Sequence, residues 1–299
     1  MRVLVDADSM VYGCGFAVER TLYEYVMYEG DIPHDGGVAA TKDELEQVRS
    51  LLPEGWTLEV APFKEAEPLV HALALAKRQL VGLEEELDAL NVEYERLELF
   101  LTGGRNFRDD IATLKVYKGN RIDIPKPVHY RGIRRYLRER WGALVIRGWE
   151  ADDQVAMLAH QLGYDPERVC IVSQDKDLLT VPGRLYNYRK KEMRVITEQE
   201  ARIYFWRQVL EGDPTDNVGG CYKIGKTKAA KLITENMTDQ EAWGMILDCY
   251  EESQSKPGCP YADKDPIEVA TENARLLHML RWEGQVWTPP GGSVEYKAA

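Results

Sequence analysis

The sequence predicts an α/β fold in which a mostly parallel central sheet is flanked by helices. Four short apolar runs have the length of buried strands, and each is followed by turn residues and a helical pattern: Val3–Val5, Leu97–Leu101, Ala143–Ile146 and Val169–Val172. Polar residues stand directly after each run, at the point where a strand would end. Strands that alternate with helices form a parallel sheet covered on both sides.

Length and composition are those of an ordinary globular protein. The chain has 299 residues, of which 44% are hydrophobic and 29% charged, enough for one substantial core. No run approaches the roughly 18 apolar residues of a membrane span, and no signal-peptide pattern stands at the N-terminus. The five cysteines form no C-x-x-C pair, so neither a disulfide framework nor a zinc site is expected, and the expected location is the cytoplasm.

A single domain over residues 1–299 is expected. Residues 1–200 would form the α/β core with a mostly helical insertion at 17–96, and residues 201–299 would hold a helix-hairpin-helix element at 217–232 and a C-terminal helical region. Thr41, Thr197 and Thr238 are each followed three positions later by Glu, the spacing of a capping box at a helix start. Apolar residues at alternating four and three spacing predict a core-facing helix from Pro68 to Leu90.

Carboxylates dominate the residues that follow the first, third and fourth runs, and two more stand in a later turn. They are Asp6, Asp8, Glu150, Asp152, Asp153, Asp175, Asp177, Asp213 and Asp216. In open α/β sheets ligands bind outside the carboxyl ends of the strands. These side chains are therefore expected to converge on one crevice.

So many carboxylates in one crevice require a cation, because like charges at close range repel and raise one another's pKa. Oxygen ligands without His or Cys favour a hard ion such as Mg²⁺ or Mn²⁺. Two such ions clamp the attacking and leaving oxygens of an in-line displacement at phosphorus, so phosphodiester hydrolysis fits. For the segment Glu150 to Asp153 taken alone, helix capping is an equal alternative.

The net charge of −12 is unevenly distributed. Residues 105–140 are rich in Arg and Lys, and a second basic cluster, Lys223, Lys226, Lys228 and Lys231, follows Asp216. A locally basic surface is therefore available for nucleic acid. The alternative is that such runs are only the solvated faces of helices.

A glycine-rich segment follows the later acidic turn. Gly220 to Thr227 match the phosphate-loop pattern G-x-x-x-x-G-K-[ST] of nucleotide triphosphatases. That pattern requires a buried strand before it, whereas the upstream residues predict a helix around Ile203–Leu210 and a polar turn. We favour a helix, a hairpin and a second helix from near Lys226, which would present backbone amides to a DNA phosphate.

Together these motifs resemble the 5′ nuclease superfamily, and they are most similar to bacteriophage 5′ to 3′ exonucleases. The motifs are Val5-Asp6-Ala7-Asp8, Phe107-Arg108, Tyr117-Lys118-Gly119-Asn120-Arg121, Glu150-Ala151-Asp152-Asp153, the segment Ser173 to Leu179, the segment Gly212 to Asn217, and Lys223-Ile224-Gly225. The resemblance covers residues 1–12 and roughly 97–235. It implies a PIN-like fold and a metal-dependent 5′ to 3′ exonuclease or structure-selective flap endonuclease that hydrolyses DNA in phage replication or recombination, in the host cytoplasm. Removal of RNA primers is left open.

The resemblance also implies roles for single residues. The first of two Mg²⁺ or Mn²⁺ ions would be held by Asp6, Glu150, Asp152 and Asp175, and the second by Asp153, Asp177, Asp213 and Asp216, with Asp8 a further candidate. Lys118 and Arg121 would contact the scissile phosphate. DNA with a 5′ end or 5′ flap, or an RNA–DNA hybrid, would be bound by Arg105, Arg108, Arg134, Arg138, Gly220, Lys223, Gly225, Lys226, Thr227 and Lys228. A K⁺ ion would bind at the hairpin carbonyls, and no nucleotide triphosphate or membrane is expected as a partner.

The chain departs from the family pattern at two places. Relatives have an acid after the second strand, where this chain has Thr102-Gly103-Gly104, so one ligand would be missing or supplied by Asp8, Asp109 or Asp110. The family's arch falls between Arg121 and Glu150, where this chain offers a linker and one basic helix from about Tyr130 to Trp141. A short or open gateway is expected.

Two alternatives remain open at this point. A haloacid-dehalogenase-type phosphatase would use Asp6 as a nucleophile and Thr102 after a later strand, but it leaves the acids of the third and fourth runs and the lysine-rich hairpin without a role. A protein that binds DNA 5′ ends or junctions without cutting them is the second alternative, since the usual acid near Gly103 is absent.

Overall fold

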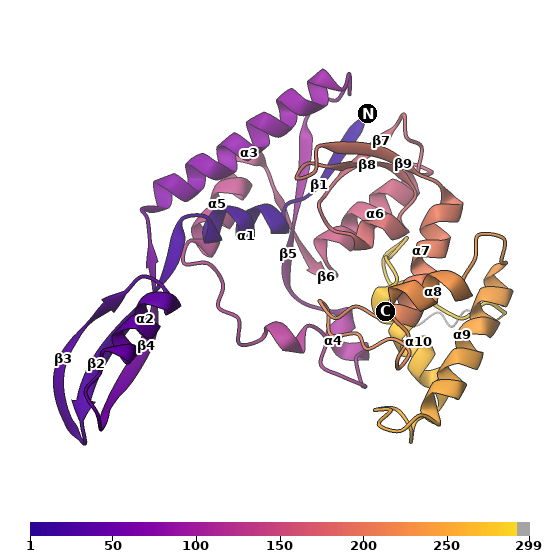
Figure 1. The fold of residues 1–299 in the computed structure, drawn as a ribbon. Coiled ribbons are helices and arrows are strands. Elements are labelled where there is room, and N and C mark those ends of the chain that lie inside the picture. The colour runs from indigo at the N-terminus through magenta and orange to yellow at the C-terminus, as the bar shows by residue number, and fades with distance from the viewer. Residues whose placement is uncertain (292–299) are drawn as a thin grey trace. The chain divides into compact units, whose positions relative to one another are not determined.

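The computed structural model describes residues 1–291 and contains a six-stranded sheet of the predicted kind (Figure 1). The strands lie in the order β6-β5-β1-β7-β8-β9. All neighbours pair in parallel except β8 and β9, which are antiparallel. The bounds are Arg2–Asp6 (β1), Leu97–Asn106 (β5), Leu144–Gly148 (β6), Val169–Val172 (β7), Gly183–Asn187 (β8) and Glu192–Ile196 (β9). The predicted α/β class and its four strands are confirmed, and β8 and β9 are additional.

Helix α6 (Ala151–Gln161) packs against one face of this sheet. Leu4, Phe100 and Ile171 contribute side chains from three strands to the same buried cluster as Val155 of the helix. A short helix, α4 (Phe107–Ile111), follows β5, and two 3-10 turns stand at Gly119–Arg121 and Asp177–Thr180. The acidic segments of the sequence start at the carboxyl ends of β1, β6 and β7.

The C-terminal helices form a second core. They are α7 (Glu198–Glu211), α8 (Lys226–Leu232), α9 (Asp239–Gln254) and α10 (Pro266–Leu277). Trp206, Val209, Ile246 and Tyr250 are buried together at its centre. Thr197 and Thr238 cap α7 and α9 in complete capping boxes, as predicted. The part of the predicted C-terminal region from residue 292 on lies outside the described residues.

The chain divides into two compact units, where a single domain was expected. The first unit comprises residues 1–9, 83–125 and those from 137 on, and the second comprises residues 10–82 and 126–136. Three helices have residues in both units: α1 (Asp8–Phe16), α3 (Leu69–Ala89) and α5 (Tyr130–Trp141). The candidate site described below lies entirely within the first unit.

The expectation of a mostly helical insertion at 17–96 is wrong for its first half. Three antiparallel strands stand there in the order β3-β2-β4 (Figure 1), with bounds Glu19–Glu29 (β2), Ile32–Ala39 (β3) and Trp56–Ala66 (β4), and α2 (Lys42–Ser50) lies between the last two. Most residues of this sheet are at least partly exposed. With few buried positions the strands lack the apolar runs that marked the central sheet, which explains why they were missed.

The second half of the insertion is the predicted long helix. Helix α3 buries Ala76, Leu80, Leu83 and Leu87, which confirms a core-facing stripe, although Leu90 beyond its end is 45% exposed. Thr41 caps α2 as predicted, since its side chain accepts a hydrogen bond from the backbone N–H of Glu44. Within residues 1–291, every helix is too short or too polar to cross a membrane.

Candidate active site

The carboxylates at the ends of β1 and β7 are joined through one serine. Asp6 is the last residue of β1 and is 6% exposed. Ser173 Oγ donates to Asp6 Oδ2 at 3.2 Å and accepts from the backbone N–H of Asp175 at 3.0 Å. The backbone N–H of Asp8 donates to Asp6 Oδ1 at 3.2 Å. Two neighbouring strands thus place Asp6 and Asp175 in one cluster, as their positions in the sequence predicted.

Glu150 stands at the start of α6, directly after β6. Its carboxylate accepts from Lys118 Nζ at 2.5 Å and from the Tyr117 hydroxyl at 2.8 Å. Ligand atoms of Glu150, Asp152 and Asp153 lie within 4.8 Å of one another. Glu150 therefore stands at the N-cap of α6 and also faces cationic and phenolic partners, so the helix-start and cluster alternatives hold together.

The segment that carries Lys118 is docked onto the acidic turn at 213–217. The backbone N–H of Lys118 donates to the carbonyl of Asp216 at 2.9 Å, and Asn217 Nδ2 donates to the carbonyl of Val116 at 2.9 Å. Asp216 itself accepts from the Tyr117 hydroxyl at 2.6 Å and pairs with Arg121 at 3.1 Å. Lys118 has a left-handed backbone with φ of 52°. These contacts bring the two predicted cations, Lys118 and Arg121, to the acids.

A further pair of carboxylates surrounds Lys176. Its ammonium lies 2.6 Å from Asp213 Oδ2 and 3.3 Å from Asp177 Oδ1. Gln208 Nε2, from α7, donates to Asp177 at 2.6 Å. Lys176 and Gln208 were not singled out from the sequence, although Lys176 stands inside the quoted motif between two of the acids, which was the available signal.

Burial and mutual repulsion shift several of these carboxyl groups toward the neutral form. Burial, followed by the charges of Asp8 and Asp175, raises the pKa of Asp6 to about 7. Burial and the charge of Asp175 likewise raise the pKa of Asp177 to about 7. The pKa of Asp152 is raised well above its ordinary value by burial and by the charges of Glu150 and Asp153. A cation would relieve this repulsion.

Glu150 has the opposite shift. Burial alone would raise the pKa of Glu150, but the charges of Lys118 and Arg108 outweigh it and hold that pKa below its ordinary value. Tyr117 stays protonated, since burial raises the pKa of its phenol well above the ordinary value. Its single O–H lies within reach of both Glu150 and Asp216.

Arg108 is not a DNA contact, contrary to the sequence-based expectation. Its side chain is 1% exposed and forms a two-point ion pair with Asp153, with Nη2 to Oδ1 at 2.9 Å and Nη1 to Oδ2 at 2.5 Å. Asp153 is 0% exposed, and each of its oxygens also accepts a backbone N–H, from Leu280 and from Glu150 respectively. With its acceptor positions used, Asp153 does not fit the predicted role of metal ligand.

The hairpin exposes most of the residues expected to bind DNA. Lys223, Gly225, Lys226, Thr227 and Lys228 are all exposed. Helix α7 precedes the hairpin and α8 follows it from Lys226, so no strand stands where a phosphate loop requires one.

Gly220 is the exception among the hairpin residues. It is buried with φ of 61°, and an added Cβ would lie 2.3 Å from the backbone nitrogen of Gly212. Its role is therefore close backbone packing.

The remaining arginines have different surroundings. Arg105 pairs with Asp110 at the surface. Arg134 lies over the ring of Tyr130 on α5 at 5.3 Å, and Arg138 on the same helix is exposed. Asp109 accepts from the backbone N–H of Asn106 as part of the cap of α4.

Thr102, Gly103 and Gly104 lie within β5 and not in a turn after it, and other contacts stand where relatives have an acid. The backbone N–H of Thr102 donates to Asp8 Oδ2 at 2.9 Å, and Thr102 Oγ1 accepts from the backbone N–H of Ala151 at 2.9 Å. An added Cβ on Gly103 would lie 2.3 Å from the carbonyl oxygen of Ile146. Asp8 thus contacts the residue that stands where relatives have the acid, whereas Asp109 caps α4 and Asp110 pairs with Arg105.

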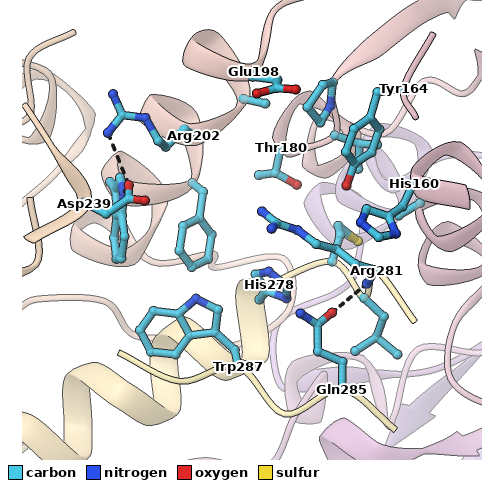
Figure 2. A pocket seen from close by; sticks show the side chains of 18 of the residues that line it. His160, Tyr164, Thr180, Glu198, Arg202, Asp239, His278, Arg281, Gln285 and Trp287 are labelled. Carbon is cyan, nitrogen blue, oxygen red and sulfur yellow. Dashed lines mark hydrogen bonds and ion pairs between the residues drawn. The ribbon is translucent and has the colours of Figure 1, made fainter. Parts of the chain in front are cut away.

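A cavity of about 620 Å³ in the first unit lies elsewhere. Figure 2 shows part of its lining, which includes His160 of α6 and His278, Arg281 and Trp287 after α10. Phe205 of α7 also lines it. None of the clustered carboxylates lines this cavity. The candidate active site is thus the acidic cluster, and not this cavity.

Comparison with known proteins gives consistent similarities. The chain is 28% identical over 220 residues to a 5′-3′ exonuclease of Buchnera aphidicola subsp. Acyrthosiphon pisum (strain APS), covering 68% of this chain and 74% of that protein. It is 32% identical over 197 residues to a 5′-3′ exonuclease of Buchnera aphidicola subsp. Schizaphis graminum (strain Sg), covering 62% and 66%. A solved structure of T5 5′-exonuclease with bound divalent zinc matches at a TM-score of 0.50 and 17% identity, covering 67% of this chain and 80% of that one. No protein-family model matches the chain.

Proposed function

The chain belongs to the 5′ nuclease superfamily, and we propose that it hydrolyses DNA phosphodiester bonds from 5′ ends or at 5′ flaps with the help of divalent metal ions. One observation carries this proposal. Lys118 pairs with Glu150 after β6 and with Asp216 in the turn at 213–217, and Arg121 pairs with the same Asp216. Lys176 joins Asp213 of that turn to Asp177 after β7, and Ser173 joins the segment after β7 to Asp6 of β1. The relatives named 5′-3′ exonuclease support the same activity.

The carboxylates fit a pair of divalent ions. The donor set consists of oxygen atoms. Burial, together with the charges of neighbouring acids, raises the pKa of Asp6 and Asp177, and a cation would relieve the repulsion between them. The residues proposed to hold the ions are Asp6, Glu150, Asp152 and Asp175 at one site and Asp177, Asp213 and Asp216 at the other, with Asp8 able to contribute. When bound, the ions supply a nucleophilic water at neutral pH and neutralise charge on the phosphate. Mg²⁺ or Mn²⁺ is the proposed identity.

Lys118 and Arg121 are proposed to act on the scissile phosphate. Both side chains now pair with carboxylates, Lys118 with Glu150 at 2.5 Å and Arg121 with Asp216 at 3.1 Å. In the substrate complex each would exchange a carboxylate oxygen for a phosphate oxygen. Their positive charge would then stabilise the charge that develops as the bond breaks. Because the single O–H of Tyr117 lies within reach of both Glu150 and Asp216, it can donate to either of these carboxylates when the cations move.

The exposed hairpin is proposed to bind the DNA backbone. Lys223, Lys226 and Lys228 provide charge without side chains arranged to contact base edges, which fits binding that is independent of sequence. We propose K⁺ at the hairpin carbonyls, and DNA with a 5′ flap, or an RNA–DNA hybrid, as the substrate. The proposed location is the cytoplasm.

A cleavage assay on a duplex with a single-stranded 5′ flap, labelled separately at each end, tests the proposal. With Mg²⁺ or Mn²⁺ we expect products released from the 5′ side, and with EDTA intact DNA. Stepwise release would indicate exonuclease action, and one product cut at the junction would indicate flap endonuclease action. Intact DNA with either metal would contradict catalysis, and binding without cleavage would favour the non-cutting alternative.

The phosphatase alternative has weaker support. It gives no role to the contacts of Glu150 with Lys118 and Tyr117, and the named relatives are nucleases. Release of phosphate from a small phosphomonoester, without DNA cleavage, would favour it.

A further inference from the structure

We propose that Arg108 is a positioning residue, which fixes the carboxylate of Glu150 through Asp153 so that Glu150 can bind a divalent ion. This inference rests on the proposed function, because it assigns a role toward the metal site. Arg108 follows β5 at the start of α4, 42 positions before Glu150 in the chain. It was expected at the DNA surface, and its burial requires another role.

The guanidinium of Arg108 has an acceptor for each of its N–H directions. Nη1 and Nη2 pair with the two oxygens of Asp153, and Nη1 also lies 3.5 Å from Glu150 Oε2. Nε donates to the carbonyl of Leu276 at 2.8 Å, and Nη2 also donates to the carbonyl of His278 at 3.0 Å. A guanidinium held at so many points has a fixed position and orientation.

Asp153 transmits this fixed position to Glu150. The backbone N–H of Glu150 donates to Asp153 Oδ2 at 3.2 Å, and the backbone N–H of Leu280 donates to Asp153 Oδ1 at 3.1 Å. The backbone of Glu150 is therefore held through Asp153, while its side chain faces Arg108 and the Lys118 ammonium. We define residues 276–280, which supply two carbonyls and one N–H to this pair, as the C-terminal strap. The strap residues from His278 to Leu280 also line the cavity of Figure 2.

A contribution to folding stability does not account for this arrangement. A buried ion pair is on average no more stabilising than a well-packed apolar pair of the same volume. Side chains that hold a metal ligand in place, by contrast, change metal affinity by roughly tenfold to a hundredfold when they are replaced. The two roles therefore predict different effects of an apolar replacement.

The test measures Mn²⁺ binding by titration calorimetry, together with the midpoint of thermal unfolding, in the absence of DNA. We expect Arg108→Lys, which keeps the charge and loses the two-point contact, to weaken Mn²⁺ binding by about tenfold or more. Asp153→Asn should weaken it to a similar degree. The matched control is Arg20→Lys, in an exposed ion pair with Glu65, and it should bind Mn²⁺ like the unaltered protein.

The double variant Arg108→Met with Asp153→Leu separates positioning from packing. We expect it to unfold at a lower temperature, because the carbonyls of Leu276 and His278 and the N–H groups of Glu150 and Leu280 lose these partners, and at a temperature where it is folded to bind Mn²⁺ about tenfold or more weakly. Unchanged Mn²⁺ affinity in Arg108→Lys, or in the folded double variant, would overturn the inference. A complete loss of Mn²⁺ binding in Asp153→Asn, with binding unchanged in Arg108→Lys, would also overturn it, because Asp153 would then be a direct ligand.

The same titration separates this inference from the proposed function. If the unaltered protein binds no divalent ion, the proposed function fails and the inference fails with it. If the unaltered protein binds Mn²⁺ and Arg108→Lys binds it equally well, only the inference fails.

Discussion

Asp6 and Glu150 stand at the carboxyl ends of strands in the same sheet, and each is 6% exposed, yet their electrostatic surroundings are opposite. Glu150 pairs with Lys118 and lies near Arg108, and its pKa is held below the ordinary value despite its burial. Asp6 accepts from a hydroxyl and a backbone N–H, and in residues 1–291 no cationic side chain forms an ion pair with it. Burial and neighbouring acids raise its pKa to about 7.

The difference shows that equal burial does not imply equal charge. On the Glu150 side the protein's own cations balance the carboxylate before any metal arrives. On the Asp6 side the acids face one another, and their ionisation depends on an added cation. In the metal-free protein, cationic side chains therefore balance the charge of Glu150, whereas the charge around Asp6 is balanced only when a metal ion binds.

Removing a charge from the Asp6 side should have the largest effect. We expect Asp175→Asn to lower cleavage by about a thousandfold or more, because a ligand that sustains the metal's contribution of several kcal/mol is lost. The metal-free protein should at the same time become more stable at pH 8, since one of the charges that repel Asp6 and Asp177 is gone. Single-turnover cleavage and thermal unfolding in EDTA measure both effects.

Asp263 is exposed, and Asp263→Asn is the control for that variant. It should change neither the cleavage rate nor the thermal stability. A full cleavage rate in Asp175→Asn would remove Asp175 from the metal site. A lower stability at pH 8 would contradict the repulsion on the Asp6 side.

Removing a cation from the Glu150 side should have a smaller effect. We expect Lys118→Ala to lower turnover by about 10²-fold, because the contact strengthens as charge develops on the phosphate, while DNA affinity changes little. Single-turnover rates and equilibrium DNA binding separate the two. The control Lys264→Ala removes an exposed lysine and should leave both unchanged. A drop in affinity with unchanged turnover would make Lys118 a ground-state contact only.

The pH dependence of stability tests the comparison without substitutions. Since Asp6 and Asp177 have folded-state pKa values of about 7 against the ordinary 3.8, the folded protein binds more protons than the unfolded chain near neutrality. Their contribution to stability is therefore present at low pH and is lost as pH rises through about 7. We expect the unfolding midpoint in EDTA to fall from pH 6.5 to 8.5.

Added Mn²⁺ should reduce that fall, because the ion binds the ionised acids. The pH range begins at 6.5 because of His278, whose pKa is lowered by burial to about 3. Its contribution to stability increases with pH and no longer changes above its ordinary pKa of 6.5. A midpoint in EDTA that rises across this pH range would contradict the assignment of Asp6 and Asp177.

A change away from both the Asp6 side and the Glu150 side should have the smallest effect. Lys226→Ala, on the exposed hairpin, is expected to weaken DNA binding a few-fold and to lower the slope of log affinity against log salt by about 1. Single-turnover cleavage at saturating DNA should be unchanged. An unchanged salt slope would mean that the DNA backbone does not contact Lys226.

Much of the central fold was predictable because it is buried. The runs at Val3–Val5 and Val169–Val172 are apolar on both faces, which distinguishes them from helices and loops. Strands β2 and β4 are largely exposed, and Pro62 interrupts the alternation in β4, so neither gave a strand signal.

The site was predictable in its residue types and less so in its contacts. The position of acids after parallel strands brings Asp6, Glu150 and Asp175 to one edge of the sheet whatever the detailed packing. The burial of Arg108 depends on carbonyls from residues 276–280, more than 160 positions later, and nothing local marks an arginine as buried. Long-range partners of this kind are set by tertiary packing, and one sequence does not reveal them.

The C-terminal strap also bears on the time at which the site is completed. Leu280 follows Asp153 by 127 positions. At synthesis rates of about 5–20 residues per second, roughly 6–25 s pass between the two on the ribosome. Within that interval the last strand of the sheet ends at Ile196, and from then on the sheet and α6 are available to fold while Arg108 and Asp153 still lack their strap partners. The last contacts behind Glu150 therefore form long after the strands that carry the acids, and the nascent chain passes through a stage with a sheet but without a finished site.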